Sequence, residues 1–240
     1  MSYNWLATIA FVLTLFVVSK VGVFLVFKVP AFAKTRQMNR DVDRVKLSRK
    51  RFRQAVKVNN KAGLIANAVF YVTVLPFCIS FETGPFWRYL VEILAILLIF
   101  DFFYYLTHRF LFHGKLLRKV HALHHQARQP THIDALYVHP LETVIGLALF
   151  LFSIPLVALI AGAPLNLFAV AVATLIFTHF NTLNHVWVDL PYFPFRYINW
   201  VTSVHAAHHV NMDSGNYATL TMVYDWMFRT FEKPVSRSEP

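Results

Sequence analysis

Cysteine, charge and glycine motifs are all scarce in this chain of 240 residues, and each shortage excludes a class of protein. The single cysteine, Cys78, excludes an internal disulfide, a cysteine-ligated iron–sulfur cluster and a CxxCH haem site. The seven glycines form neither a GxGxxG nor a P-loop pattern, so the sequence predicts no nucleotide or flavin module of its own. Charged residues make up 15% of the chain, against about 25% in soluble domains, which favours a membrane protein.

Long apolar runs take the place of the missing charge, since 57% of the residues are hydrophobic and the mean hydropathy is +0.48. Five stretches approach the ~20 residues that a spanning helix needs, at 4–29, 62–81, 88–107, 140–162 and 165–187. The first lacks the basic head and small-residue cleavage site of a signal peptide, so we expect a retained helix. The runs predict an all-α, polytopic membrane helical bundle of four to five spans.

Positive charge is concentrated in one segment, which indicates how the chain sits in the membrane. Residues 30–61 hold eleven lysines and arginines of a chain with net charge +11, whereas the short turns at 82–87 and 161–164 have none. Basic residues mark the cytoplasmic side, so we expect the N-terminus outside and 30–61, 108–139 and 188–240 in the cytoplasm. Residues 30–61 are either an amphipathic helix on the membrane or a solvated basic connector. This distribution argues against a nucleic-acid partner.

All twelve histidines lie between residues 108 and 209, at what the topology predicts to be one membrane face. The sequences HALHH at 121–125 and HAAHH at 205–209 place histidines at i, i+3 and i+4, within about 100° of a helix. The apolar hairpin between them returns the second group to the side of the first. We therefore expect a histidine-rich helical cap. His108 and His113 are five residues apart, which places them on different faces of a regular helix. For both to reach the other histidines, the chain needs a π-bulge near 110–112 or a helix end before His113.

So many imidazoles in one place predict bound metal, since imidazole suits zinc, iron, copper and nickel. A pH sensor or a loose metal-scavenging tract would not need two H-x-x-H-H units on one face. Eight imidazoles exceed the ligands of one ion, so two ions are expected. The candidate ligands are His108, His113, His121, His124, His125, His205, His208 and His209, followed by His179 and His185.

These motifs, in this order, resemble the histidine boxes of the fatty acid hydroxylase/sterol desaturase superfamily of membrane enzymes. The resemblance covers about residues 90–232 and includes an Asp before the first box, an HPLE stretch, histidines in the last span, and an Asn-Tyr pair followed by an Asp. In this chain they are Asp101, His139–Glu142, THFNTLNH, Asn216–Tyr217 and Asp225. The family's Asn-Tyr-Gly and Phe-Gly-Thr read NYA and FRT here. We expect membrane helices and the basic connector 30–61 in residues 1–85, and a catalytic domain in 86–240.

The resemblance implies a non-haem di-iron oxygenase that hydroxylates or desaturates a lipid C–H bond in lipid, sterol or fatty acid metabolism. It implies two iron ions, which zinc can replace on purification, and O2 as co-substrate. Its partners are a lipid in the bilayer and a separate electron donor, either cytochrome b5-like or a ferredoxin with its reductase. The membrane is the bacterial cytoplasmic membrane or the ER, with the active site on the cytoplasmic face.

Four further residues are candidates for supporting the ligands rather than binding metal: Asp101, His139, Glu142 and Asp225. Asp101 lies two helical turns before His108, so its carboxylate either orients a ligating imidazole or pairs with Arg109 or Arg118. We expect no catalytic residue beyond the ligands.

The alternative is a metal-binding membrane protein without oxidative chemistry: a di-zinc hydrolase, a metal transporter or a sensor. Imidazole ligands alone do not choose iron over zinc. A transporter would need polar ligands through the middle of the bilayer, whereas these histidines concentrate at one edge.

Overall fold

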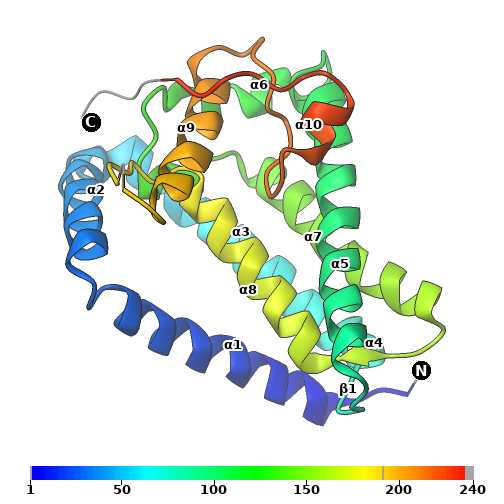
Figure 1. Ribbon diagram of the computed structural model, residues 1–240. Helices are drawn as coiled ribbons and strands as arrows, with labels where there is room; N and C mark the ends of the chain where they lie inside the picture. Colours follow the sequence, from blue (N-terminus) through cyan, green and yellow to red (C-terminus); the bar gives the residue numbers. More distant parts are fainter. Residues whose placement is uncertain (1, 191, 236–240) are drawn as a thin grey trace.

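The protein is a bundle of helices in which two short strands pair over two residues each (Figure 1). The computed structural model describes residues 2–190 and 192–235, so the last five residues of the expected catalytic domain lie outside it. The elements, in chain order, are α1 (Trp5–Val26), α2 (Pro30–Ser48), α3 (Lys50–Thr73), α4 (Leu75–Cys78), β1 (Ile79–Ser80), α5 (Phe86–Thr107), the π-helical turn η1 (His108–Phe112), α6 (Arg118–His121), the 3-10 turns η2 (His124–Gln126) and η3 (His132–Leu136), α7 (Pro140–Ala161), β2 (Leu165–Asn166), α8 (Leu167–Leu183), α9 (Arg196–Val210) and α10 (Val223–Met227).

Within residues 2–190 and 192–235, three helices are long and apolar enough to cross a membrane: Trp5–Val26, Phe86–Phe112 and Pro140–Ala161. The predicted membrane helical bundle is thereby confirmed. Helix α8 is apolar but has 17 residues, and the expected span at 62–81 is the end of α3 followed by the short α4. The count of four to five spans therefore stays a prediction for α3 and α8.

Local sequence explains where the apolar helices begin and end. Helix α7 starts with Pro140, whose missing N–H is no loss at this position, and the ring of His139 accepts from the N–H of Leu141. It ends at Gly162, which has the left-handed φ of +69° that favours glycine. The side chain of Asn166 caps α8 by accepting from two backbone N–H groups of its first turn.

The apolar core lies between α5, α7 and α8, with α3 packed on α7 and α1 on α8. The rings of Phe150 and Phe177 stack 4.1 Å apart, and Phe100 meets both edge-on. Helix α1 is otherwise exposed and apolar, as expected of a lipid-facing helix. The helices thus form a bundle whose outer surface suits a bilayer.

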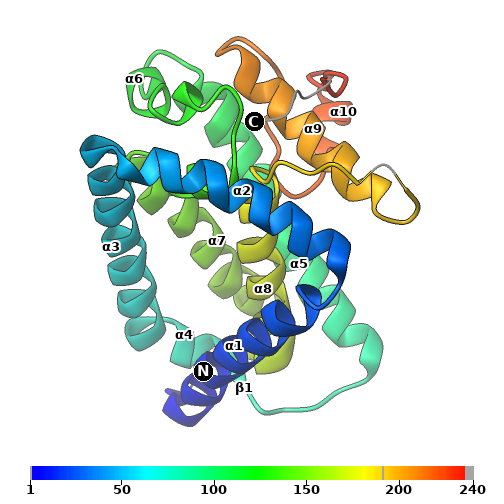
Figure 2. The same cartoon turned by 90° about the vertical axis from the view of Figure 1, so that its left-hand side faces the viewer.

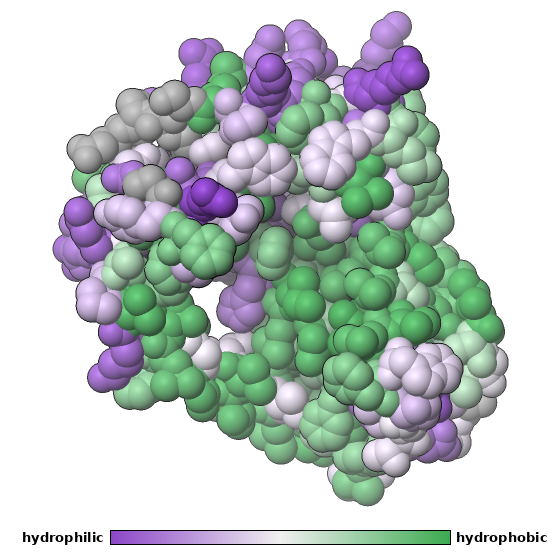
Figure 3. All heavy atoms as spheres, viewed as in Figure 1, coloured by the Kyte–Doolittle hydropathy of each residue, from purple (hydrophilic) through white to green (hydrophobic). Residues whose placement is uncertain are grey.

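Polar structure gathers at one end of the bundle, where α6, α9 and α10 lie (Figure 1). Figure 3 shows hydrophilic atoms along this end and a largely hydrophobic surface below it. Residues 30–61 form α2 and the start of α3, and α2 runs across the bundle (Figure 2). Two contacts hold α2 in place: Lys46 pairs with Asp134, and Asn39 donates to the carbonyl of Trp187. The basic segment is therefore packed against the same end as the histidines.

Candidate metal centre

Nine histidines converge at the polar end in two adjacent clusters whose ligand atoms lie within 4.8 Å of one another inside each cluster. The first, which we call the five-histidine cluster, contains His108, His113, His121, His125 and His208. The second, the four-histidine cluster, contains His124, His185, His205 and His209. All except His113 are buried, and His113 is at the border of burial. The hairpin of α7 and α8 brings residues 108–125 and 205–209 together, as the topology predicted.

The two H-x-x-H-H units exchange members between the clusters. His121 and His125, four residues apart, join His208 of the distal unit in the five-histidine cluster. His205 and His209, also four apart, join His124 of the first unit in the four-histidine cluster. Each unit thus contributes a pair to one cluster and a single imidazole to the other. The two clusters therefore share the same chain segments and lie side by side.

A π-helical turn resolves the position of His108 and His113. The N–H of His113 donates to the carbonyl of His108 over 2.9 Å, a bond that closes a wide turn of five residues. Their ring centroids lie 4.9 Å apart, so both imidazoles reach the same cluster. Of the two arrangements that the spacing allowed, the structure has the π-helical turn, and His113 caps its end.

Backbone carbonyls hold four of these nine rings. The Nδ1 atoms of His108, His113 and His208 lie 2.6–2.7 Å from the carbonyls of Tyr217, Met212 and Gly215, and Nδ1 of His185 lies 2.9 Å from that of Asn181. A carbonyl only accepts, so each Nδ1 carries the proton and each Nε2 keeps a free lone pair. Glu142 holds His121 in the same way, with Oε1 at 2.9 Å from Nδ1.

The free Nε2 atoms then meet one another. In the five-histidine cluster the Nε2 of His108 lies 3.0 Å from that of His121, and in the four-histidine cluster the Nε2 of His185 lies 3.1 Å from those of His124 and His205. Nδ1 of both His108 and His121 faces an acceptor, so their two Nε2 lone pairs repel at this distance unless a cation lies between them. Ligands at right angles on an ion with bonds of ~2.1 Å would be ~3.0 Å apart. The donor set therefore fits a transition-metal ion in each cluster.

Burial keeps these imidazoles neutral, which is the form that binds metal. Loss of water, together with the nearby His113 and Arg118, lowers the pKa of His125 to about 3. Burial and the neighbouring imidazoles also hold the pKa values of His124, His205 and His209 well below their usual range. Protons therefore do not compete for these nitrogens near neutral pH.

Two buried carboxylates support the site through the loop that follows α9. Asp101 accepts from the N–H groups of Thr219, Leu220 and Thr221. Neither expected partner, an imidazole or an arginine, appears beside Asp101 among the residues that the structure describes. Asp225 accepts from the N–H of Tyr217, whose carbonyl holds His108. Both carboxylates hold the backbone near a carbonyl that orients a ligand. Asp101 therefore acts on the ligand through the backbone and not by direct contact with an imidazole, as the sequence had suggested.

Two of the expected histidines lie outside the clusters. His179 is exposed on α8, and the clusters recruit His185, six residues later, from the end of this helix. His139 is exposed and caps α7. The sequence did not predict which carbonyls orient the imidazoles. The one exception is the Asn-Tyr motif, because the carbonyl of its Tyr217 contacts His108.

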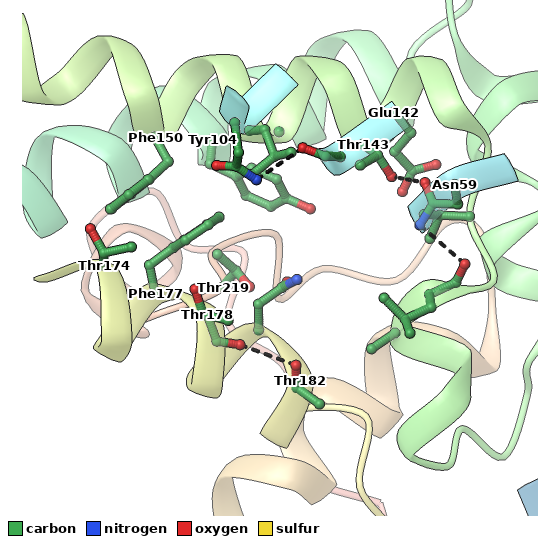
Figure 4. Close-up of a pocket in the computed structure, with 18 of the residues that line it drawn as sticks. Asn59, Tyr104, Glu142, Thr143, Phe150, Thr174, Phe177, Thr178, Thr182 and Thr219 are labelled. Carbon is green, nitrogen blue, oxygen red and sulfur yellow. Dashed lines mark hydrogen bonds between the residues drawn. The ribbon is translucent and has the colours of Figure 1, made fainter. Parts of the chain in front are cut away.

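A cavity of about 450 Å³ leads from the clusters into the apolar bundle. It is lined by α1, α3, α5, α7 and α8, and His108, His124, His185 and His205 form one part of its wall. Figure 4 shows Phe150 and Phe177 at one end of this cavity and Glu142 with Asn59 toward the other. The candidate metal centre therefore borders a cavity that extends between the apolar helices.

Comparison with known proteins agrees with this geometry. A model of the fatty acid hydroxylase family matches residues 93–230, more than half of the chain. Methylsterol monooxygenase 1 of Rattus norvegicus is 30% identical over 70% of this chain and 56% of its own length, and a putative methylsterol monooxygenase of Dictyostelium discoideum is 34% identical over 59% and 51%. A very-long-chain aldehyde decarbonylase of Oryza sativa subsp. indica is 28% identical over 55% and 22%.

This chain therefore spans about half the length, or less, of the curated relatives it matches. No solved structure matches it with significant similarity. The matched region runs from within α5 to beyond α10 and contains every histidine of both clusters. The family match and the paired histidine clusters lead to one conclusion: the chain belongs to the fatty acid hydroxylase family.

Proposed function

We propose that this protein is a membrane-bound, non-haem di-iron oxygenase that hydroxylates or desaturates a C–H bond of a lipid with O2. One observation carries the proposal: two clusters of neutral imidazoles form the wall of a cavity that extends into the apolar bundle. A hydrocarbon substrate can thus reach the metal centre from the bilayer. The relatives named as methylsterol monooxygenases support a lipid substrate and oxygenase chemistry.

The proposed ligands of one iron are the five-histidine cluster, and those of the other are the four-histidine cluster. When bound, the two irons supply the redox chemistry that activates O2. The chain's own contribution is to hold the rings: backbone carbonyls and Glu142 keep the Nδ1 proton of five of the nine imidazoles in place, which leaves Nε2 of these rings free for metal. Apolar walls at Phe150 and Phe177 hold a hydrocarbon and exclude water from it.

The proposed location is the bacterial cytoplasmic membrane or the ER, with the site on the cytoplasmic face. Support comes from the basic helix α2 and the start of α3, which lie at the same end as the clusters, because lysine and arginine favour the cytoplasmic side. Electrons would come from a separate donor protein of the cytochrome b5 or ferredoxin type, which reaches the site from this side.

The test is expression in a host without such enzymes, followed by mass spectrometry of the extracted lipids. We expect a lipid that has gained one oxygen atom or lost two hydrogen atoms, only with O2 present, and no such product from His124→Ala. The variant His179→Ala is the matched control and should keep the product, since His179 lies outside both clusters. Bound zinc after anaerobic purification, with no O2-dependent product, would favour a di-zinc hydrolase instead.

A further inference from the structure

The cavity wall beside the clusters carries a phenol group that the proposed chemistry does not use. Tyr104 lies on α5 one helical turn before His108, and their ring centroids are 5.2 Å apart. On its other side the ring meets Phe100 at 5.5 Å. Gly146 of α7 faces the ring, since a β-carbon there would lie in ordinary contact with Cε2 of Tyr104, at 3.6 Å. Tyr104 thus separates the aromatic end of the cavity from the metal ligands.

Tyr104 is half-buried and lines the cavity, and its hydroxyl makes no hydrogen bond to another residue that the structure describes. Figure 4 shows this ring directed into the cavity, with Thr178 of α8 on the opposite wall. Asn181 lines the same wall one turn further along α8. A hydroxyl without a partner in an apolar bundle costs free energy unless a ligand or water satisfies it. The arrangement therefore points to a polar group of the substrate.

The lining also limits the charge of that group. Among the described residues that line the cavity there is no lysine, arginine or aspartate, and the one acidic side chain, Glu142, is bound to His121. Neutral amides and hydroxyls line both α3 and α8, including Asn67 and Thr178. Away from the proposed metal ions, a carboxylate or phosphate at the phenol would lose its hydration without gaining a cationic side chain, whereas a hydroxyl or carbonyl would find hydrogen bonds.

We infer that Tyr104, with Thr178 and Asn181 facing the same cavity, forms a binding subsite for an uncharged polar group of the lipid substrate, a hydroxyl or carbonyl rather than a carboxylate or phosphate. This inference rests on the proposed function and makes Tyr104 a specificity-determining residue. The phenol donates to the oxygen of the lipid, and the hydrocarbon remains in the apolar part of the cavity. The subsite lies one helical turn from the ligand His108.

The test is equilibrium binding of radiolabelled 1-octadecanol and octadecanoate to the purified, metal-loaded protein in detergent, without electron donor. We expect tighter binding of octadecanol than of octadecanoate. Tyr104→Phe should weaken octadecanol binding by about three- to tenfold, the effect of one hydrogen bond, and leave octadecanoate unchanged. Metal content and melting temperature of the variant should equal those of the wild type, which shows that the fold is retained.

Tyr71→Phe is the matched control, because Tyr71 also lines the cavity, from α3, but its ring packs against Phe11 of α1 at 5.4 Å and not against a proposed metal ligand. It should change octadecanol binding by less than twofold. The inference is overturned if octadecanol does not bind, if octadecanoate binds as tightly, or if the Tyr104 and Tyr71 variants behave alike. The binding measurement does not depend on turnover. If the host makes an oxidised lipid but Tyr104→Phe does not change octadecanol binding, only the subsite is refuted. Selective binding without any oxidised product refutes the oxygenase alone.

Discussion

The carbonyl oxygen of Phe110 lies 1.9 Å from where a β-carbon on residue 114 would be, so only glycine fits at Gly114. This contact closes the chain behind the π-helical turn that carries His108 and His113 into one cluster. The turn is wider than a turn of α-helix, and the backbone that follows it passes close to the carbonyl of Phe110. The placement of two proposed ligands thus depends on a residue with no side chain.

Gly114→Ala should therefore damage the metal centre without removing a ligand. The added methyl group forces the backbone of the π-helical turn to shift, which moves His113 away from the five-histidine cluster. We expect about one metal ion per chain instead of about two, measured by elemental analysis of the purified protein. Gly22→Ala on α1 is the matched control, since no atom lies within 4 Å of a β-carbon there. Equal metal content in both variants would contradict this role of the turn.

His185 and His179 lie six residues apart on the same segment, yet the structure predicts opposite results for them. His185→Ala removes one of four imidazoles from its cluster, so the metal content should fall by about one ion per chain. His179→Ala should leave it unchanged, because this side chain is exposed on α8. Elemental analysis under the same loading conditions compares the two. A loss of metal from His179→Ala would show that the ligand set extends beyond the two clusters.

Asp101→Ala should destabilise the protein strongly, although Asp101 touches no imidazole. The change leaves three backbone N–H groups in a buried loop without their acceptor, at about 1–3 kcal/mol for each. We expect a melting temperature lower by several degrees and partial loss of metal, because this loop adjoins the carbonyl that holds His108. Asp41→Asn, at an exposed position on α2, should melt like the wild type. A normal melting temperature for Asp101→Ala would refute the proposed support.

Metal-free protein should lose stability as the pH falls below about 6.5. Burial lowers the pKa of His125 to about 3, whereas its usual value is 6.5, so between these values the unfolded chain binds a proton that the folded chain excludes. Stability is therefore fully present above pH 6.5 and is lost as the pH falls toward 3, by roughly 1 kcal/mol per pH unit for each such histidine. Denaturant unfolding at pH 7.5 and pH 5 in detergent measures the difference. Equal free energies of unfolding at both values would contradict the prediction.

Helical periodicity predicted much of the candidate site correctly. Pairs four residues apart, His121 with His125 and His205 with His209, do stay within one cluster, since four residues make about one turn. Periodicity also indicated that His108 and His113 need an irregular turn. It did not predict that His124 leaves its neighbours for the other cluster, because α6 ends at His121 and a 3-10 turn redirects the next residues.

The sequence by itself determined the type of ligand, the membrane setting and the convergence of the two histidine units. These follow from composition, hydropathy and the even number of apolar runs between the units, all of which are local properties of the chain. Only the tertiary structure decided how the imidazoles divide between two clusters, that His179 stays outside, and that Asp101 binds a loop 118–120 residues away. Those outcomes depend on backbone carbonyl and amide groups, which nearly every residue carries, so no pattern of side chains predicts them. Which carbonyl or amide contacts which side chain is decided only when the helices pack together.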